Sequence, residues 1–324
     1  MQVTSQSQFE AAERDAVPPL ERITDGLYSL GVEFPGAKPH ATLCYLLQDG
    51  NDIHIIDPGW DSDQNWQRLV SNLETIGGRP NQIRSVTVTH LHPDHLGMAQ
   101  RVRDETNALV AVHLAEQRAL EELSAPQPKQ LVLERFKNWG APDSKVQDLL
   151  SAFERRSNWR GIDADLLLED GENLPIKGLG IRVLHLPGHT TGHLGLVDAK
   201  RGYLFTGDHL LPNQFSGIGL GGQSHSNPIE DYFQSLDRML EFDEFEALPG
   251  HGYRFKGISE RTNQVRSHHL ERAREVSTQL GETSVWKIAE KLSWTDGWQN
   301  LSGLALLSAL SQTELHVDRL RSLT

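Results

Sequence analysis

The chain has 324 residues, of which 31 are Lys or Arg and 44 are Asp or Glu, so its formal net charge is −13 at pH 7. A chain this acidic does not attract nucleic acid through bulk charge, so nucleic-acid binding is disfavoured and stays only an alternative. The single cysteine, Cys44, excludes an intrachain disulfide and a cysteine-rich zinc site. The length exceeds one ordinary core, so one large domain with a smaller appendage is expected.

Residues 1–18 are polar and of mixed charge, and we expect them to form a tail. They lack the basic and apolar regions of a signal peptide, and no apolar run in the chain is long enough to span a membrane. The sequence therefore predicts a cytoplasmic protein that has no membrane partner and acts on a small molecule.

Apolar or alternating runs, bounded by Gly, Pro, Asn and Asp, predict strands that are separated by helices. Strands are expected at 27–34, 42–47, 53–56, 83–89, 109–112, 166–168, 181–186, 194–197, 203–206 and 247–248. Helices are expected at 63–74, 96–105 and 228–241. This pattern favours an α+β protein in which two sheets pack face to face and helices cover them.

One segment between a strand and a helix is crowded with potential metal ligands. Residues 89–97 read Thr-His-Leu-His-Pro-Asp-His-Leu-Gly, with metal-competent side chains at His90, His92, Asp94 and His95. Alternation along an extended chain sends His90 and His92 to the same side, and Pro93 turns the chain into the next helix. This single corner could therefore hold ligands for two ions.

Zinc-like ions take about four ligands, so more His or carboxylate side chains must come from downstream. Three candidates each follow an apolar run and lie in a glycine-flanked corner: His189 in Leu-Pro-Gly-His-Thr-Thr-Gly-His, Asp208 in Phe-Thr-Gly-Asp-His, and His251 in Leu-Pro-Gly-His-Gly. Each alone could be an ordinary turn with a surface side chain, but their occurrence together favours a metal site. These ligand types suit Zn, with Fe or Mn as alternatives.

These segments, preceded by Ile-Ile-Asp-Pro-Gly at 55–59, resemble the metallo-β-lactamase-fold hydrolase superfamily over roughly residues 22–256. The resemblance implies a four-layer αββα sandwich with two divalent metal ions. It assigns one ion to His90, His92 and His189, the other to Asp94, His95 and His251, and places Asp208 between them. It also implies that Asp57 supports the ligands from behind. We expect His193, the second His of the segment around His189, to support ligands as well.

Two ions in such a site lower the pKa of a bridging water, so that hydroxide exists near neutral pH and can attack a carbonyl or phosphorus. Asp94 is the expected catalytic carboxylate, which orients this nucleophile or carries its proton to the leaving group. The preferred substrate is a small ester, thioester or lactone. The alternatives are a phosphodiesterase or ribonuclease of the same fold, and a non-catalytic binding module in which the metals are structural.

Residues 114–161 interrupt the strand rhythm with a pattern rich in Leu, Glu, Gln and Arg, which predicts a helical insertion. Its aromatic side chains either pack the helices on one another and on the core, which we favour, or form a lid over an apolar pocket. The candidate pocket residues are Trp139 in the insertion, His209 beside Asp208, and Phe215 and His225 in the following loop.

Linkers such as Gly-Asp-His-Leu-Leu-Pro at 207–212 resemble the superfamily's subgroup with a winged-helix-like C-terminal domain, the β-lactamase-like protein 2 type. We therefore expect a catalytic domain at 19–259 and a small helical domain at 260–324, with no room for a β-wing. Its helices are expected at 264–280, 285–292 and 301–321. From Arg261 onward there are 8 basic and 7 acidic residues, so a helical cap or a homodimer element is favoured over nucleic-acid binding.

Overall fold

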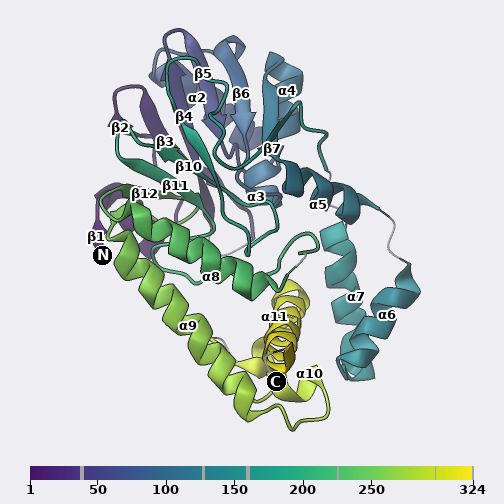
Figure 1. Ribbon diagram of the computed structural model, residues 1–324. Helices are drawn as coiled ribbons and strands as arrows, with labels where there is room; N and C mark the ends of the chain where they lie inside the picture. Colours follow the sequence, from purple (N-terminus) through teal and green to yellow (C-terminus); the bar gives the residue numbers. More distant parts are fainter. Residues whose placement is uncertain (37–39, 126–127, 158–160, 225, 296, 323–324) are drawn as a thin grey trace.

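The computed structural model describes residues 1–36, 40–125, 128–157, 161–224, 226–295 and 297–322. Two β-sheets pack face to face and helices cover both outer faces, which gives the four-layer αββα arrangement expected from the sequence (Figure 1). No helix in these ranges is both long and apolar enough to cross a membrane.

The first half of the chain builds a sheet of seven strands in the order β2-β3-β4-β5-β6-β7-β8. Neighbouring strands are antiparallel from β2 to β5 and parallel from β5 to β8. Helices α2 (Asp63–Thr75) and α4 (Ala99–Thr106), with the 3₁₀ turn η1 (Pro80–Gln82), lie in the parallel connections. The strands are β2 (Glu21–Thr24), β3 (Leu27–Glu33), β4 (Ala41–Asp49), β5 (Asp52–Ile56), β6 (Ile83–Thr87), β7 (Leu109–His113) and β8 (Leu166–Leu168).

The second sheet has six strands in the order β1-β13-β12-β11-β10-β9. Helices α8 (Pro228–Met239) and α9 (Ile258–Thr278) pack on its outer face, and the 3₁₀ turn η2 (Leu240–Phe242) follows α8. The strands are β1 (Gln2–Val3), β9 (Arg182–His185), β10 (Leu194–Asp198), β11 (Tyr203–Gly207), β12 (Glu246–Pro249) and β13 (Phe255–Lys256).

Strand β4 shows how the layers are held together. Leu43, Tyr45 and Leu47 join the apolar cluster between the two sheets, whereas Cys44 and Leu46 join the cluster beneath the helices of the first sheet. Period-2 alternation explains this division, and burial on both faces explains why the strand reads as a continuous apolar run. Cys44 is the buried structural thiol that the run suggests, and burial raises the pKa of its thiol.

Residues 1–18 do not form the expected tail. Strand β1 pairs with β13, and helix α1 (Gln6–Glu13) follows with Ser5 as its N-cap. The amide of Gln8 is buried, where its Nε2 donates to Ser29 Oγ at 2.8 Å and its Oε1 accepts from Arg254 N at 3.0 Å. Polar composition suggested a solvated tail, but these polar groups find their partners within the protein.

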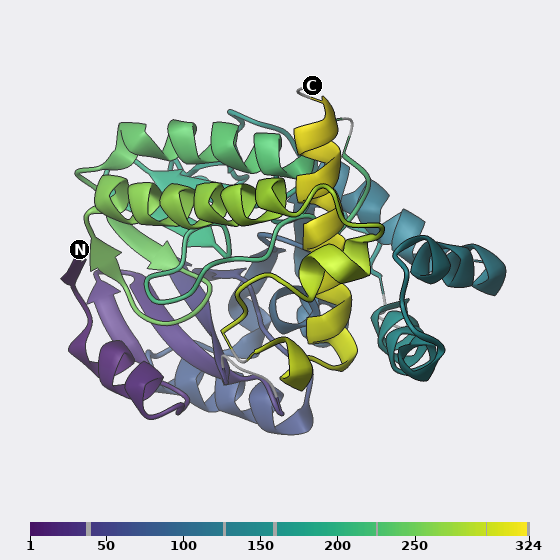
Figure 2. The ribbon, with the colours of Figure 1, turned by 90° about the horizontal axis from the view of Figure 1, so that it is seen from below.

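The insertion and the C-terminal region pack on each other. The insertion contains α5 (Leu114–Ser124), α6 (Lys129–Asn138) and α7 (Asp143–Ser157), and the C-terminal region continues after α9 with α10 (Val285–Ala289), η3 (Trp298–Asn300) and α11 (Gly303–Ser322). Phe136 and Leu149 share an apolar cluster with Trp286, Leu306 and Leu310. Figure 2 shows α11 between the α8–α9 pair and the α6–α7 pair. Within the described residues no strand follows β13, so the C-terminal region is helical without a β-wing.

Candidate metal centre

The candidate ligands follow the carboxyl ends of strands that meet at one rim of the sandwich. Strands β5 and β6 are parallel, as are β11 and β12, while β9 runs in the direction of β11 because both are antiparallel to β10. The corner after β6 leads into the short helix α3 (Pro93–Leu96), which carries Asp94 and His95. His189, Asp208 and His251 lie in the corners after β9, β11 and β12. The shared direction of these strands thus brings together residues that are far apart in sequence.

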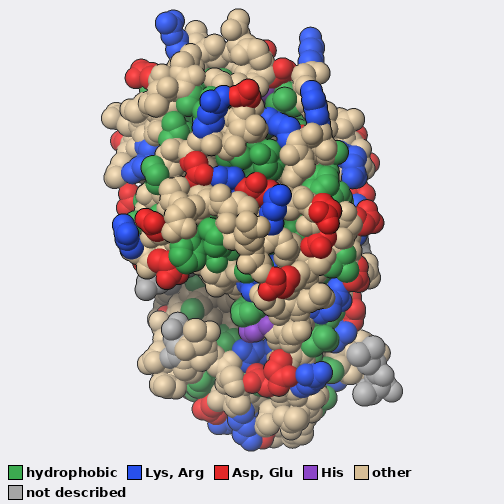
Figure 3. Space-filling model, turned by 90° about the vertical axis from the view of Figure 1, so that its left-hand side faces the viewer, with side chains coloured by type: hydrophobic (Ala, Val, Ile, Leu, Met, Phe, Trp, Pro, Cys, Tyr) green, Lys and Arg blue, Asp and Glu red, His purple; other side chains and the backbone are tan. Residues whose placement is uncertain are grey.

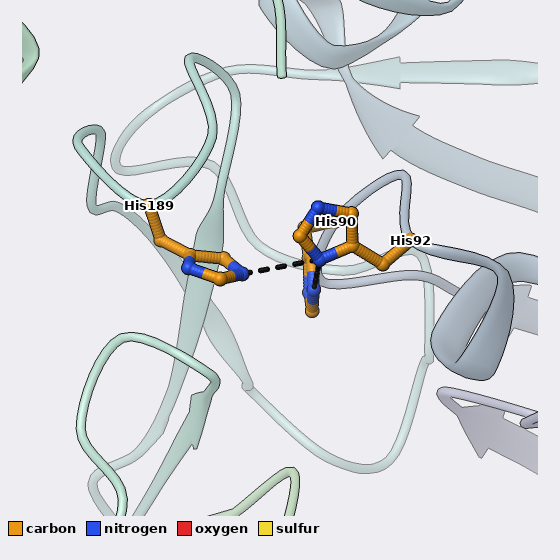
Figure 4. A group of neighbouring side chains, drawn as sticks. All are labelled: His90, His92 and His189. Atoms are coloured by element: carbon orange, nitrogen blue, oxygen red, sulfur yellow. Dashed lines mark hydrogen bonds between the residues drawn. The ribbon is translucent and has the colours of Figure 1, made fainter. Parts of the chain in front are cut away.

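Three histidines form the first group of ligand atoms. His90 Nε2 lies 2.9 Å from His92 Nδ1, and His189 Nε2 lies 3.2 Å from the same His92 atom (Figure 4). The two rings from the β6 corner and the ring from the β9 corner therefore point at one place. Their ligand atoms all lie within 4.8 Å of one another, as a shared ion requires.

Asp94, His95 and His251 form the second group. His251 Nε2 lies 3.2 Å from Asp94 Oδ2 and 3.2 Å from His95 Nε2. Asp208 lies between the two groups, because its Oδ1 is 3.3 Å from His95 Nε2 while its Oδ2 is 3.4 Å from His251 Nε2 and 4.0 Å from His189 Nε2. The structure thus brings all seven side chains named from the sequence into one cluster.

The ring nitrogens that face away from the centre have acceptors of their own. His251 Nδ1 donates to the carbonyl of Ala41 at 2.8 Å, and His189 Nδ1 donates to the carbonyl of Gly217 at 2.7 Å. These bonds select the tautomer whose Nε2 lone pair points inward. The buried Oδ1 of Asp208 has no hydrogen-bond partner among the described residues. Inward lone pairs and an unsatisfied carboxylate oxygen fit divalent cations.

Asp57 connects the two groups from behind. Its Oδ2 accepts from His95 Nδ1 at 2.8 Å and from Thr89 Oγ1 at 2.7 Å. Because the Thr89 proton is used in that bond, Thr89 Oγ1 accepts from His90 Nδ1 at 3.0 Å. Asp57 has a φ of 52°, a left-handed backbone conformation that is uncommon outside glycine and that often marks functional sites. One buried carboxylate therefore orients a histidine of each group.

The surroundings lower the pKa of some histidines of the cluster and raise the pKa of others. Burial lowers the pKa of His92 to about 3 and lowers that of His189, so these imidazoles are neutral and can act as ligands. Burial would also lower the pKa of His251, but the carboxylates of Asp208 and Asp94 raise it to about 10. The same two carboxylates raise the pKa of His95. This side of the cluster is therefore electronegative, which suits a cation.

Glycine and a further histidine shape the corner that carries Asp208. A Cβ atom at Gly250 would lie 2.4 Å from Asp208 Oδ1 and 2.7 Å from His95 Cε1, so only glycine lets the β12 corner come this close. His193 Nε2 accepts from the backbone N–H of Asp208 at 3.1 Å. It holds that backbone and is not a member of either ligand group.

The cluster opens into a cavity of about 360 Å³, and the four candidate pocket residues differ in their relation to it. Phe215 lines the cavity, whereas Trp139 and His209 do not. Trp139 is buried beside the C-terminal helices, where its Nε1 donates to Glu314 at 2.7 Å. His209 is buried against Tyr232 behind the cluster. His225 lies outside the described residues.

The insertion packs on the C-terminal helices, as favoured for its aromatic side chains, so Trp139 does not belong among the pocket residues. Aromatic side chains supply much of the apolar area that such packing buries. Among the C-terminal helices, α11 lines the cavity through Leu304, Leu307, Ser308 and Ser311. The sequence predicted this helix, but no local pattern indicated which surface it would cover.

Glu116 on α5 is a site residue that the sequence did not reveal. Its carboxylate is buried, and Oε1 accepts from the N–H of Leu91 and from Thr190 Oγ1, both at 2.7 Å. Oε2 accepts from the N–H of Gly192 at 2.7 Å. Burial raises its pKa to about 7. Glu116 therefore ties the corner that holds His90 and His92 to the corner that holds His189.

The variant Glu116→Gln tests this connection. An amide offers one acceptor oxygen, so its NH₂ group would face one of the N–H donors, and we expect the two corners to separate. Metal affinity should fall by about 10- to 100-fold, as for other residues that orient ligands. Metal titration of the purified protein measures this change. The matched control is Glu121→Gln, an exposed residue of the same helix. Equal metal affinities in the two variants would contradict the assigned role.

A sandwich with a His and Asp cluster at one rim defines a metallo-hydrolase type of protein. The chain belongs to the metallo-beta-lactamase superfamily, because the model of that family matches residues 37–251. This match confirms the resemblance drawn from the ligand segments.

Curated relatives lie within the same class. The chain is 27% identical over 217 residues to the probable metallo-hydrolase YqjP of Bacillus subtilis, a match that covers 65% of this chain and 66%, just under two thirds, of that relative. It is 23% identical over 268 residues to a beta-lactamase-like protein 2 homolog of Caenorhabditis elegans, covering 82% and 75% of the two chains. It is 28% identical over 233 residues to the hydroxyacylglutathione hydrolase GloC of Haemophilus influenzae, covering 68% and 90%.

A solved structure extends the likeness beyond residues 37–251. A metallo-beta-lactamase family protein from Thermus thermophilus superposes with a TM-score of 0.77 at 25% identity, covering 93% of this chain and 95% of that one. The coverage includes most of the C-terminal helical region. The fold is thus shared along nearly the whole chain.

Proposed function

We propose that the protein is a dinuclear metal-dependent hydrolase of small esters, thioesters or lactones. The observation that carries the proposal is the meeting of seven ligand side chains at the floor of a largely apolar cavity. Two divalent ions, for which Zn is the first candidate, would be held by His90, His92 and His189 and by Asp94, His95 and His251, with Asp208 contacting both. When bound, such ions supply Lewis-acid chemistry and an activated water.

Asp94 is the proposed proton-transfer residue. It lines the cavity, and its Oδ2 is 3.2 Å from His251 Nε2. The neighbouring His95 and His251 outweigh the effect of burial and lower its pKa, so the carboxylate is ionised and can accept a proton. From this position Asp94 can take the proton of the attacking water and pass it to the leaving group.

The surroundings of the cavity support a carbonyl substrate over a nucleic acid. None of the described residues that line it is Lys or Arg. On the face shown in Figure 3, basic and acidic side chains are mixed and form no extended patch of one sign. Phosphodiester recognition depends on clustered positive charge. GloC is named for hydrolysis of hydroxyacylglutathione, which is a thioester, and this likeness also supports carbonyl chemistry.

Metal removal tests the proposal. Dialysis against a chelator should abolish hydrolysis of a panel of p-nitrophenyl esters, simple thioesters and lactones. Adding Zn, Mn or Fe(II) back should restore it, because the ions supply the nucleophile. Metal content and initial rates are measured on the same samples.

Two results would count against this function. Ester hydrolysis that persists after the metal has been removed would show that the metal centre takes no part in the reaction. A metal-loaded protein that cleaves bis-p-nitrophenyl phosphate or single-stranded RNA, and none of the carbonyl substrates, would instead make it a phosphodiesterase or ribonuclease.

A further inference from the structure

The cavity above the metal centre has an apolar wall, and none of the described residues that line it is Lys or Arg. Apart from Pro93 in the ligand corner, its apolar lining comes from three separate parts of the chain: Phe34, Leu211, Phe215, Leu220, Leu304 and Leu307. The remaining polar side chains away from the cluster are the neutral Gln214, Ser216, Ser308 and Ser311. The carboxylates that line it, Asp94 and Asp208, belong to the ligand cluster. A substrate group that lies against this wall meets hydrocarbon, neutral hydroxyl groups and one amide.

Helix α11 supplies one side of this wall. Its lining residues are Leu304, Leu307, Ser308 and Ser311, and their spacing of three, four and seven places them on one helical face. Leu307 is buried, whereas Leu304 is 44% exposed at the opening. The face that the C-terminal helix turns toward the catalytic domain is therefore part of the substrate cavity.

Phe215 is a second exposed apolar side chain that lines the cavity, and it is fixed in place. It is 46% exposed, its ring stacks on that of His268 with centroids 3.8 Å apart, and the guanidinium of Arg261 lies 4.8 Å from its centroid. Large apolar side chains that stay exposed at a catalytic cavity gain free energy when an apolar ligand covers them.

We infer that the acyl group of the substrate is an uncharged aliphatic chain that lies against α11 and Phe215. The inference rests on the proposed ester or thioester hydrolysis and names its substrate class. Each methylene that becomes fully buried favours binding by about fourfold, so reactivity should rise with chain length until the cavity is filled. A carboxylate at the end of the acyl chain would lose its hydration and should be rejected, because no Lys or Arg is among the described lining residues. The nearby Arg261 is buried, and its guanidinium already donates to the carbonyls of Leu211 and Gln214.

Acyl thioesters of N-acetylcysteamine test the inference, because their leaving group is neutral. With the metal-loaded protein, kcat/KM should rise at least about tenfold from acetyl through butyryl to hexanoyl. The succinyl thioester, which has nearly the shape of butyryl but carries a carboxylate, should react at least about tenfold more slowly than butyryl.

A charge introduced on α11 should reverse this preference. In Leu304→Lys the succinyl to butyryl ratio of kcat/KM should rise by about tenfold, since the ammonium can pair with the distal carboxylate. Leu131→Lys is the matched control, because Leu131 is 57% exposed on α6 and does not line the cavity. Metal content is measured for each protein, so that a change in the ratio is not attributed to loss of ions.

The outcomes separate this inference from the proposed function. Hydrolysis of the series without dependence on chain length, or an unchanged ratio in Leu304→Lys, would overturn the acyl pocket and leave the hydrolase intact. If the metal-loaded protein hydrolyses p-nitrophenyl esters but no thioester of the series, the acyl assignment fails alone. If it hydrolyses no carbonyl substrate at all, both fail together.

Discussion

Replacement of His92 by alanine is expected to lower the metal content by about one ion per chain and to reduce hydrolysis by more than about a hundredfold. His92 Nδ1 is the atom at which the first group converges, 2.9 Å from His90 Nε2 and 3.2 Å from His189 Nε2. Without it only His90, His189 and the shared Asp208 remain, so the first ion loses one of its about four ligands and should be held much less tightly. The loss of activity should exceed the 10- to 100-fold loss that is typical when a residue that only orients ligands is replaced.

The fold should survive this change. His92 is only partly buried at the edge of the cavity, and the apolar clusters that hold the sheets do not include it. Metal analysis, circular dichroism and initial rates on one preparation separate loss of an ion from loss of structure. His40→Ala is the control, a partly exposed histidine outside the ligand groups. Two retained ions with normal turnover in His92→Ala would refute the dinuclear assignment.

The sequence was sufficient to predict which corners bring the His and Asp side chains together, because each corner follows a strand signal. Period-2 runs locate the strands, and the polar side chains that follow them mark the rim. The strands β3 to β12 lie where the runs placed them, to within one or two residues. Short strands such as β1 (Gln2–Val3) and β13 (Phe255–Lys256) carry no such pattern, and their pairing depends on tertiary contacts.

The features of the site that the sequence did not predict depend on which helices pack against the ligand corners and the cavity. Glu116 occupies a helix of ordinary composition, and only the fold reveals that three donors from the ligand corners surround its carboxylate. Trp139 packs in the core between the insertion and the C-terminal helices, and the sequence alone left both this packing and a place in the pocket open. Leu304 and Leu307 lie in the helix that the sequence predicts at 301–321, but that prediction does not indicate that part of the helix borders a cavity.

Replacement of Asp208 by asparagine should have a larger effect than any single histidine change, because Asp208 takes part in both groups. Its oxygens lie 3.3 Å from His95 Nε2, 3.4 Å from His251 Nε2 and 4.0 Å from His189 Nε2. The amide keeps the shape but removes the negative charge and one acceptor oxygen. We expect both ions to be lost on dialysis, and hydrolysis to fall by at least about a thousandfold.

The number of ions lost distinguishes this variant from His92→Ala. Equilibrium dialysis followed by metal analysis should give about one ion for His92→Ala and close to none for Asp208→Asn. Asp170→Asn is the matched control, since it removes a carboxylate from an exposed pair with Arg238 that contributes at most about 1 kcal/mol to stability. If Asp208→Asn kept one ion at full occupancy, Asp208 would be a ligand of a single site. The two groups would then be independent metal sites.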